Sequence, residues 1–383
     1  MKRKISVTTG SRSEYGILRS VLDEIIISKN LDLILIVSGM HLSKKFGLTL
    51  NEIKKDGFRI DAKIDMIPKG NSTFHMAQAL GNGVLGFSRV FMKLKPNINL
   101  VLGDRDEAYA SAIAASHMNI PNAHIHGGDK SKAGIDEYNR HAITKISNIH
   151  FAATKKSKER IIRMGEDPRY VFYTGSPSKD EIMKGKITSK ENLKKKYGLN
   201  FDGNEIILLQ HPVTTESKMS HFQIRNTLKA IVKTKKNTIA IAPNSDAGNN
   251  EIFKNLQEFS QKYKFVKMYK NLSREDYLGV LKNGGILVGN SSSGIIESSY
   301  FGLPVVNIGI RQKDRERSEN VIDTKDDSTQ SIYLNILKAF KLKERKFKVK
   351  KFPYGRDITA KKIISILEKI SIDKDLIQKQ IHY

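Results

Sequence analysis

Residues 286–297 read Ile-Leu-Val-Gly-Asn-Ser-Ser-Ser-Gly-Ile-Ile-Glu, and their pattern indicates the class of fold. An apolar run ends at Gly289, serines follow, and an apolar helical pattern begins at Gly294. Such a strand, turn and helix form the repeating unit of a parallel α/β sheet. Three adjacent serines exceed what helix capping requires, so Ser291 and Ser292 are predicted to hold a diphosphate with the amides of the helix start.

Short apolar runs of this kind recur along the chain, separated by helix-length stretches. Those of the first half span residues 5–9, 31–38, 99–103, 122–126, 149–153 and 170–174, and those of the second span 205–210, 237–242, 264–269, 286–289 and 304–309. The fold class is therefore predicted to be α/β, with one Rossmann-like domain over residues 1–177 and a second over 178–355. Ligands bind at the carboxyl ends of such strands, and two such sheets would face each other across a cleft.

Composition excludes several classes of protein. The 383 residues include 66 Lys and Arg against 40 acids, a net charge of +26 that suits an anionic partner. Lysines are scattered, without a basic stripe or zinc-finger spacing, so no nucleic acid is predicted as a partner. Cysteine is absent, which excludes disulfides and thiolate chemistry. The apolar run at residues 5–9 is too short for a signal peptide or membrane span, so we expect a cytoplasmic protein without membrane contact.

Residues 123–145 hold acids, imidazoles and cations at a density unusual outside an active site. This segment contributes His126, Asp129, Asp136 and Glu137 as candidate catalytic residues. Buried charges need partners, whereas a site that moves protons on a sugar needs such groups. The segment therefore predicts an enzyme.

Polar residues at other strand ends extend the candidate site. Asp104 directly follows the run 99–103 and precedes Arg105, and the acids at 106 and 107 fit a salt-bridged cap at the start of the next helix. His211 directly follows the run 205–210, at a position equivalent to that of Asn244 after the next run. The turn that contains Arg12 and Ser13 suits either an anion or a simple helix cap.

Taken together and in this order, these motifs resemble the hydrolysing UDP-N-acetylglucosamine 2-epimerases of sialic-acid and related nonulosonic-acid synthesis. The matching segments are residues 9–16, 103–105, 124–129, 135–137, 140–145, 211–215, 289–294 and 307–312. The resemblance implies a fold like that of B-type glycosyltransferases, with the active site between two domains and a last helix, about 356–383, that crosses back to the first. It also implies homodimers or homotetramers, and a reaction that uses no metal or cofactor.

The implied reaction releases free N-acetylmannosamine and UDP, and its chemistry explains the residue types. Carbon 2 must lose its proton on one face and regain a proton on the other, so at least two groups must flank the sugar. Departure of the diphosphate from carbon 1 weakens the neighbouring C–H bond, and anti elimination gives a glycal. Water then adds at carbon 1.

The resemblance also assigns roles to residues. Asp104, Asp129 and Asp136 carry over as acid/base candidates, and His126 and Glu137 share these roles. Preorganised hydrogen-bond donors would stabilise the negative charge of the leaving group. By the resemblance, these donors are Arg12, His211, Ser291 and Ser292, with Ser13 beside them. Arg105 would orient Asp104 or the diphosphate. Asn244, Glu297 and Arg311 would place the nucleotide, Glu297 through ribose hydroxyls. Many relatives carry Glu where this chain has the shorter Asp129.

Other functions are open from the sequence. The nucleotide is either UDP or GDP, and the sugar is N-acetylglucosamine or a diacetamido sugar. A non-hydrolysing 2-epimerase, a sugar transferase of the same architecture and an inactive nucleotide-sugar-binding regulator are the rival interpretations.

Overall fold

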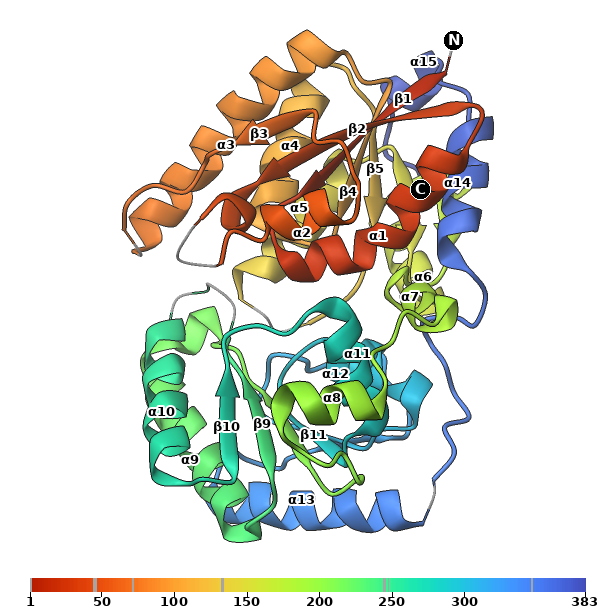
Figure 1. Cartoon of the computed structure of the whole chain (residues 1–383). Coiled ribbons are helices and arrows are strands. Elements are labelled where there is room, and N and C mark those ends of the chain that lie inside the picture. Colours follow the sequence, from red (N-terminus) through yellow and green to blue (C-terminus); the bar gives the residue numbers. More distant parts are fainter. Residues whose placement is uncertain are drawn as a thin grey trace. The chain divides into compact units, whose positions relative to one another are not determined.

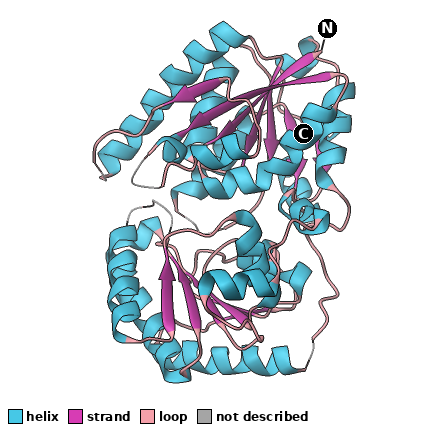
Figure 2. Ribbon diagram, in the orientation of Figure 1, coloured by secondary structure: helices cyan, strands magenta, loops and turns pink. Residues whose placement is uncertain are grey.

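The chain forms two compact units in the computed structural model, which describes residues 2–43, 47–70, 72–131, 134–243, 246, 248–345 and 347–383 (Figure 1). Unit 1 comprises Met1–Asp129, Asp136–Glu181 and Tyr354–Tyr383, and unit 2 comprises Lys130–Ile135 and Ile182–Pro353. Each unit holds one sheet with helices on both faces (Figure 2). Unit 1 is thus built from both ends of the chain, while the domain boundaries drawn from the sequence stay a prediction.

The sheet of unit 1 has seven parallel strands in the order β3-β2-β1-β4-β5-β6-β7. The strands are β1 (Arg3–Thr9), β2 (Leu31–Ser38), β3 (Ala62–Ile64), β4 (Ile98–Leu102), β5 (Asn122–Ile125), β6 (Ile149–Ala152) and β7 (Val171–Tyr173). The helices are α1 (Arg12–Ile27), α2 (Leu50–Lys55), α3 (Thr73–Leu94), α4 (Asp106–His117), α5 (Ile135–Ile146), α6 (Lys155–Arg163), α7 (Ser178–Lys184), α14 (Thr359–Lys369) and α15 (Lys374–Ile377).

Alternating side chains of the strands fill two cores, one on each face of this sheet. Leu33, Leu35 and Val37 of β2 face α1 and α14, whereas Ile34 and Ile36 of the same strand face α3 and α4. Both faces of the sheet are therefore apolar, as is usual for a parallel sheet covered by helices. Helix α14, near the C-terminus, packs against the first helix, α1.

The sheet of unit 2 has six parallel strands in the order β10-β9-β8-β11-β12-β13. The strands are β8 (Ile206–Leu209), β9 (Thr238–Ile241), β10 (Val266–Tyr269), β11 (Ile286–Gly289), β12 (Val305–Asn307) and β13 (Val321–Asp323). Helices α9 (Ser220–Thr234), α10 (Asn249–Lys262) and α13 (Thr329–Glu344) cover one face, and α8 (Lys190–Tyr197) and α11 (Arg274–Asn283) the other. The short helix α12 (Ser293–Ile296) follows β11.

All eleven strands expected from the sequence are present, and two more occur. The additional strands are β3 and β13, each three residues long and each at the edge of its sheet. Short edge strands with exposed polar residues carry little of the apolar pattern that identifies a buried strand.

Each sheet has one point at which the order of its strands reverses. In unit 1 the order reverses at β1, which lies between β2 and β4, and in unit 2 it reverses at β8, between β9 and β11. Ligands of open α/β sheets bind beyond the carboxyl ends of strands at such switch points. Within the described parts of the chain, the helices are all too short or too polar to cross a membrane.

Candidate active site

Arg140 joins the candidate acids of unit 1 into one cluster. It extends from α5 and forms ion pairs with Asp104, beyond the end of β4, and with Glu137 one turn earlier on α5. It also donates to the backbone oxygen of Asp129 at 3.3 Å. The guanidinium is buried, whereas Asp104 and Glu137 each keep 22% of the side chain exposed. Two carboxylates are thereby fixed by one cation and remain accessible.

The charge of Arg140 is stabilised by these acids. Burial lowers the pKa of Arg140, but Asp104, Asp129 and Glu137 together raise it above its usual value. Asp136 lies half-buried in the first turn of α5, next to Glu137 in sequence. Four of the predicted acid/base candidates, Asp104, Asp129, Asp136 and Glu137, thus lie in or directly beside this cluster.

The turn that carries Asp104 is supported by His124. The imidazole is fully buried on β5, and its Nε2 donates to the backbone oxygen of Gly103 at 2.7 Å. Burial lowers the pKa of His124 to about 3, so the ring is neutral. His124 therefore supports the turn before Asp104 and carries no charge into the site.

His126 and Asp129 form a second, more deeply buried pair in unit 1. His126 Nδ1 lies 3.0 Å from Asp129 Oδ2, and Asp129 Oδ1 accepts from the Ser157 hydroxyl at 2.8 Å. Only 3% of Asp129 is exposed. Gly128 permits this approach, because its φ is +70° and a Cβ there would lie 2.5 Å from the Ser157 backbone oxygen.

Sequence reasoning missed a pair of buried carboxyls beside Arg105. Glu14 and Glu107 lie 4.0 and 3.3 Å from Arg105 Nε, respectively. Burial, and next the charge of Glu107, raises the pKa of Glu14 to about 8. Glu107 lies in the first turn of α4 and is ion-paired, as the expected salt-bridged cap requires, but the residue is only 4% exposed.

Two glycines explain why Glu107 is buried. A Cβ at Gly10 or at Gly39 would collide with the Glu107 carboxyl, so the absence of side chains there opens the slot that it fills. Gly39 also has a φ of +58°, which favours glycine. These glycines after β1 and β2 are the sequence signal that could have indicated a buried side chain from the helix that follows a neighbouring strand.

The polar groups of the turn between β1 and α1 form hydrogen bonds and ion pairs with other groups of the chain. Glu14 accepts from the Gly10 amide at 3.0 Å and from the Ser11 hydroxyl at 3.2 Å. Ser11 in turn caps α1 and lies 3.0 Å from the Ser13 hydroxyl. Arg12 forms a 2.9 Å ion pair with Glu52. The structure thus shows a helix cap at this turn, and anion binding by Arg12 and Ser13 stays a prediction.

In unit 2, the side chain of Asn290 binds the backbone of His211. Asn290 Oδ1 accepts from the His211 amide at 2.7 Å, and Asn290 Nδ2 donates to the His211 carbonyl at 2.8 Å. Gly289 allows this contact between the ends of β8 and β11, because a Cβ at its φ of +138° would collide with the backbone of Leu209. Arg311 joins the group by donating to the Asn290 carbonyl at 3.3 Å.

The serine segment differs in part from its predicted form. Helix α12 has only four residues, so the aligned peptide dipoles of a long helix are absent there. Ser291 and Ser293 lie 3.1 Å apart, Ser293 also contacts the Tyr277 hydroxyl, and Ser292 is half-buried. The hydroxyls are therefore the clearest donors of this segment, and binding of a diphosphate by Ser291, Ser292 and the amides beside them stays a prediction.

Two nucleotide-binding candidates of unit 2 remain. Glu297 follows the last residue of α12, is buried, and forms a 2.6 Å ion pair with Arg274. To bind ribose hydroxyls as predicted, the Glu297 carboxylate would have to accept their hydrogen bonds while it stays paired with Arg274. Asn244 lies outside the described residues.

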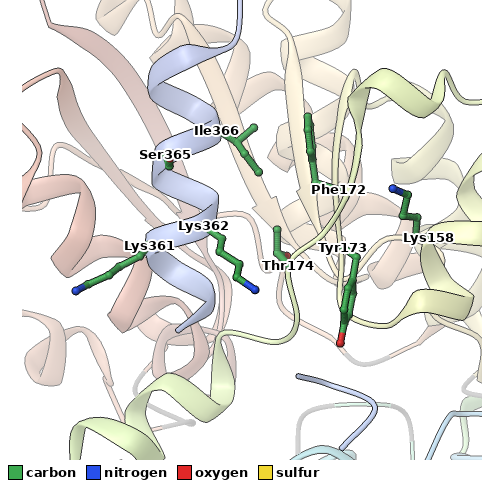
Figure 3. Close-up of a pocket in the computed structure, with 8 residues that line it drawn as sticks. All are labelled: Lys158, Phe172, Tyr173, Thr174, Lys361, Lys362, Ser365 and Ile366. Carbon is green, nitrogen blue, oxygen red and sulfur yellow. The ribbon is translucent and has the colours of Figure 1, made fainter. Parts of the chain in front are cut away.

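A surface pocket in unit 1 is separate from these groups. Its volume is about 570 Å³, and it lies between β7, α6 and α14 (Figure 3). Lys158, Lys361 and Lys362 are the charged residues that line it. It includes no candidate site residue. Over the described residues, no cluster of three or more His, Asp and Glu side chains suits a metal ion.

Known proteins share this fold and have similar sequences. A UDP-N-acetylglucosamine 2-epimerase of Neisseria meningitidis, solved with UDP-GlcNAc bound, matches this fold with a TM-score of 0.82 at 19% identity, over 96% of this chain and 100% of that one. This likeness confirms the predicted fold class, two Rossmann-like domains of the B-type glycosyltransferase kind.

Sequence comparison gives the family. A UDP-N,N'-diacetylbacillosamine 2-epimerase (hydrolyzing) of Legionella pneumophila is 40% identical over 379 residues, 99% of both chains. A UDP-N-acetylglucosamine 2-epimerase of Neisseria meningitidis is 33% identical over 342 residues, 89% of this chain and 88% of that one. The sequence profile described as UDP-N-acetylglucosamine 2-epimerase matches residues 24–368. This chain therefore belongs to the UDP-N-acetylglucosamine 2-epimerase family.

Proposed function

We propose that this protein is a hydrolysing 2-epimerase, which converts a UDP-linked 2-acetamido sugar and water into the free 2-epimer and UDP. The observation that carries the proposal is the cluster of unit 1, in which Arg140 holds the accessible carboxylates of Asp104 and Glu137 beside Asp136. Epimerisation at carbon 2 needs a proton acceptor and a proton donor on opposite faces of the sugar, and this cluster offers several such groups. The hydrolysing relative from Legionella supports the same mode of reaction.

The reaction would proceed in two steps. First, a base removes the proton of carbon 2 while the bond from carbon 1 to the diphosphate oxygen breaks, which gives UDP and a glycal. Second, water adds its oxygen to carbon 1 and gives up a proton to a base, while an acid delivers a proton to carbon 2 on the other face. We assign these proton transfers to Asp104, Asp136 and Glu137.

Unit 2 would bind the nucleotide and the departing diphosphate. His211, Arg311 and the hydroxyls of Ser291 and Ser292 are the donors available at the ends of β8, β11 and β12. The bonds from Asn290 fix the backbone of His211, and preorganised donors count most where charge develops. Arg105, held by Glu14 and Glu107, is a further cation for the diphosphate.

Two sugars are candidates for the substrate. UDP-N,N'-diacetylbacillosamine, which carries a second acetamido group, is favoured by the 40% identity to the Legionella enzyme over 99% of both chains. UDP-N-acetylglucosamine is favoured by the Neisseria relative at 33% identity. We propose the diacetamido sugar as the preferred substrate and N-acetylglucosamine as the second candidate.

Proton NMR in deuterated water with EDTA tests the proposal. The purified protein is incubated separately with both UDP-sugars and with GDP-linked diacetylbacillosamine. We expect a free 2-epimer deuterated at carbon 2, formed together with UDP. An epimerised product still linked to its nucleotide would indicate the non-hydrolysing reaction instead. If every substrate stays unchanged while UDP binds, the inactive-regulator interpretation would replace the proposal.

A further inference from the structure

We propose that the pocket between β7, α6 and α14 is a second ligand site, which binds a small phosphate monoester that carries a flat apolar group. The pocket holds none of the residues assigned to the epimerase reaction, so the proposal goes beyond that function and does not rest on it. The volume of about 570 Å³ lies in the range of pockets that enclose small molecules. The charges and the apolar residues of the lining define the ligand.

The charged residues of the lining are all cations. Lys158 comes from α6, and Lys361 and Lys362 come from the first turn of α14. The eight described residues that line the pocket include no acid. Figure 3 shows Lys158 and Lys362 on either side of Phe172 and Thr174, whereas Lys361 points away from them. Positive charge from two separate helices thus flanks the pocket.

One carboxylate offsets part of this charge. Lys362 forms a 2.7 Å ion pair with Asp357, whose side chain is 74% exposed. An exposed pair of this kind contributes little to stability, so its replacement by a bound anion costs little. Among the described residues, the amino groups of Lys158 and Lys361 have no hydrogen bond or ion pair. Three cations and one carboxylate leave a charge of +2. A phosphate monoester, with a charge of about −1.5 to −2 at pH 7, would balance it.

The two lysines of α14 lie where the helix itself disfavours them. Its first turn holds no acid, although the positive end of the helix dipole repels cations there. The first two amides of α14 donate to the carboxylate of Asp180 at 2.9 and 2.7 Å, and Asp180 is also paired with the buried Lys179. The ligand would therefore meet lysine side chains and not the helix start. A locally unfavourable pattern of this kind is expected at a functional site.

The apolar part of the lining suits a ring. Phe172 of β7 and Ile366 of α14 line the pocket, and both also pack against the core of unit 1. The Phe172 ring lies 6.2 Å from that of Phe151, between centroids, so the core fixes its position. Tyr173 and Ser365 add hydroxyl groups to the lining. A ligand with a ring for the apolar residues and a phosphate for the lysines would use both parts of the pocket.

Calorimetric titration of the full chain with phenyl phosphate tests the proposal. Methyl phosphate has a similar charge but no ring, and benzyl alcohol has a ring but no charge. We expect phenyl phosphate to bind at least about tenfold more tightly than methyl phosphate, because its ring buries apolar surface. Benzyl alcohol should show no measurable binding.

Variants locate the bound probe. In Lys158→Gln/Lys362→Gln, the affinity for phenyl phosphate should fall at least about tenfold, since two charged contacts are lost. The matched control is Lys156→Gln/Lys369→Gln. It removes two exposed lysines of the same two helices that do not line the pocket, and its affinity should match that of the wild type. Circular dichroism with a thermal melt checks that each variant is folded.

Four results would overturn the proposal. The first is a wild type that does not bind phenyl phosphate, or binds it no more tightly than methyl phosphate. The second is unchanged affinity in Lys158→Gln/Lys362→Gln. The third is an equal loss in both double variants, which would indicate general attraction to a basic surface. The fourth is a loss in Arg105→Gln instead, which would place the probe in the candidate active site.

Discussion

Asn290 binds both backbone groups of His211, accepting from its amide at 2.7 Å and donating to its carbonyl at 2.8 Å. The two residues lie 79 positions apart and follow neighbouring strands, β8 and β11. One amide side chain therefore fixes the relative position of the two strand ends at the switch point of unit 2.

Asn290→Asp should weaken nucleotide binding. The substitution keeps the acceptor for the His211 amide but turns a second oxygen toward the His211 carbonyl, and an unmade buried hydrogen bond costs about 1–3 kcal/mol. We expect UDP affinity, measured by calorimetry, to fall about tenfold. Asn283→Asp is the control, because Asn283 also donates to a carbonyl, that of Gly279 at 2.8 Å, from within α11. Equal UDP affinity in the two variants would contradict this role of Asn290.

Asp104→Asn and Asp136→Asn should each abolish turnover. Amides cannot exchange the proton of carbon 2, and we expect kcat to fall at least about a hundredfold. UDP affinity should stay within severalfold, because neither residue belongs to unit 2. Release of UDP in a coupled assay measures turnover, and calorimetry measures binding. Near-normal activity in either variant would remove that residue from the mechanism.

Gly289→Ala should destabilise the protein through a steric collision. The added Cβ would meet the backbone of Leu209, and φ at this position is +138°. We expect the free energy of unfolding in urea to fall by about 2–4 kcal/mol. Gly185→Ala separates collision from strain, since Gly185 has a φ of +77° and open space around it; about 1 kcal/mol is expected there. Similar losses in both variants would refute the collision.

Glu14→Gln should change how stability depends on pH. Burial and the charge of Glu107 raise the pKa of Glu14 from 4.5 to about 8, so the folded state binds this proton more tightly than the unfolded chain. In the wild type this contribution to stability is present below pH 4.5 and is lost as the pH rises to about 8. Glutamine does not titrate. The stability of Glu14→Gln relative to wild type should therefore rise by more than about 1 kcal/mol between pH 5 and pH 8.

Urea titrations at pH 5, 7 and 9 check this prediction. Glu24→Gln, the same change at a half-buried residue of the same helix, is the matched control. A constant difference between Glu14→Gln and wild type across the range would show that Glu14 is ionised throughout.

Local sequence patterns were sufficient to predict the strands, and to predict that the candidate site residues follow the carboxyl ends of those strands. The runs ending at Gly103, His126 and Gly289 have apolar residues flanked by turn residues, and these features are local. The polar residues just beyond them lie at the carboxyl ends of the strands because of parallel pairing, which follows from the alternation of strands and helices.

Partnerships within the site were not predictable in the same way. Gly10 and Gly39 lie 29 positions apart, and only the pairing of β1 with β2 brings both to the carboxyl of Glu107. The pair of Glu297 with Arg274 and the bonds of Asn290 with His211 likewise join distant segments. These contacts arise from tertiary packing, which a single sequence does not encode in its spacing.

The docking of α14 on α1 has a consequence for synthesis of the chain. Leu18, Leu22 and Ile25 of α1 pack in the same core as Ile363 and Leu367 of α14. These partners are synthesised more than 330 residues later. During translation, α14 therefore cannot cover the apolar face of α1 until nearly the whole polypeptide has left the ribosome. Unit 2, continuous from residue 182 to 353 apart from one short segment, is complete before then. The first unit to be started is therefore the last to be finished, and a nascent chain stalled before residue 354 would expose this face to chaperones.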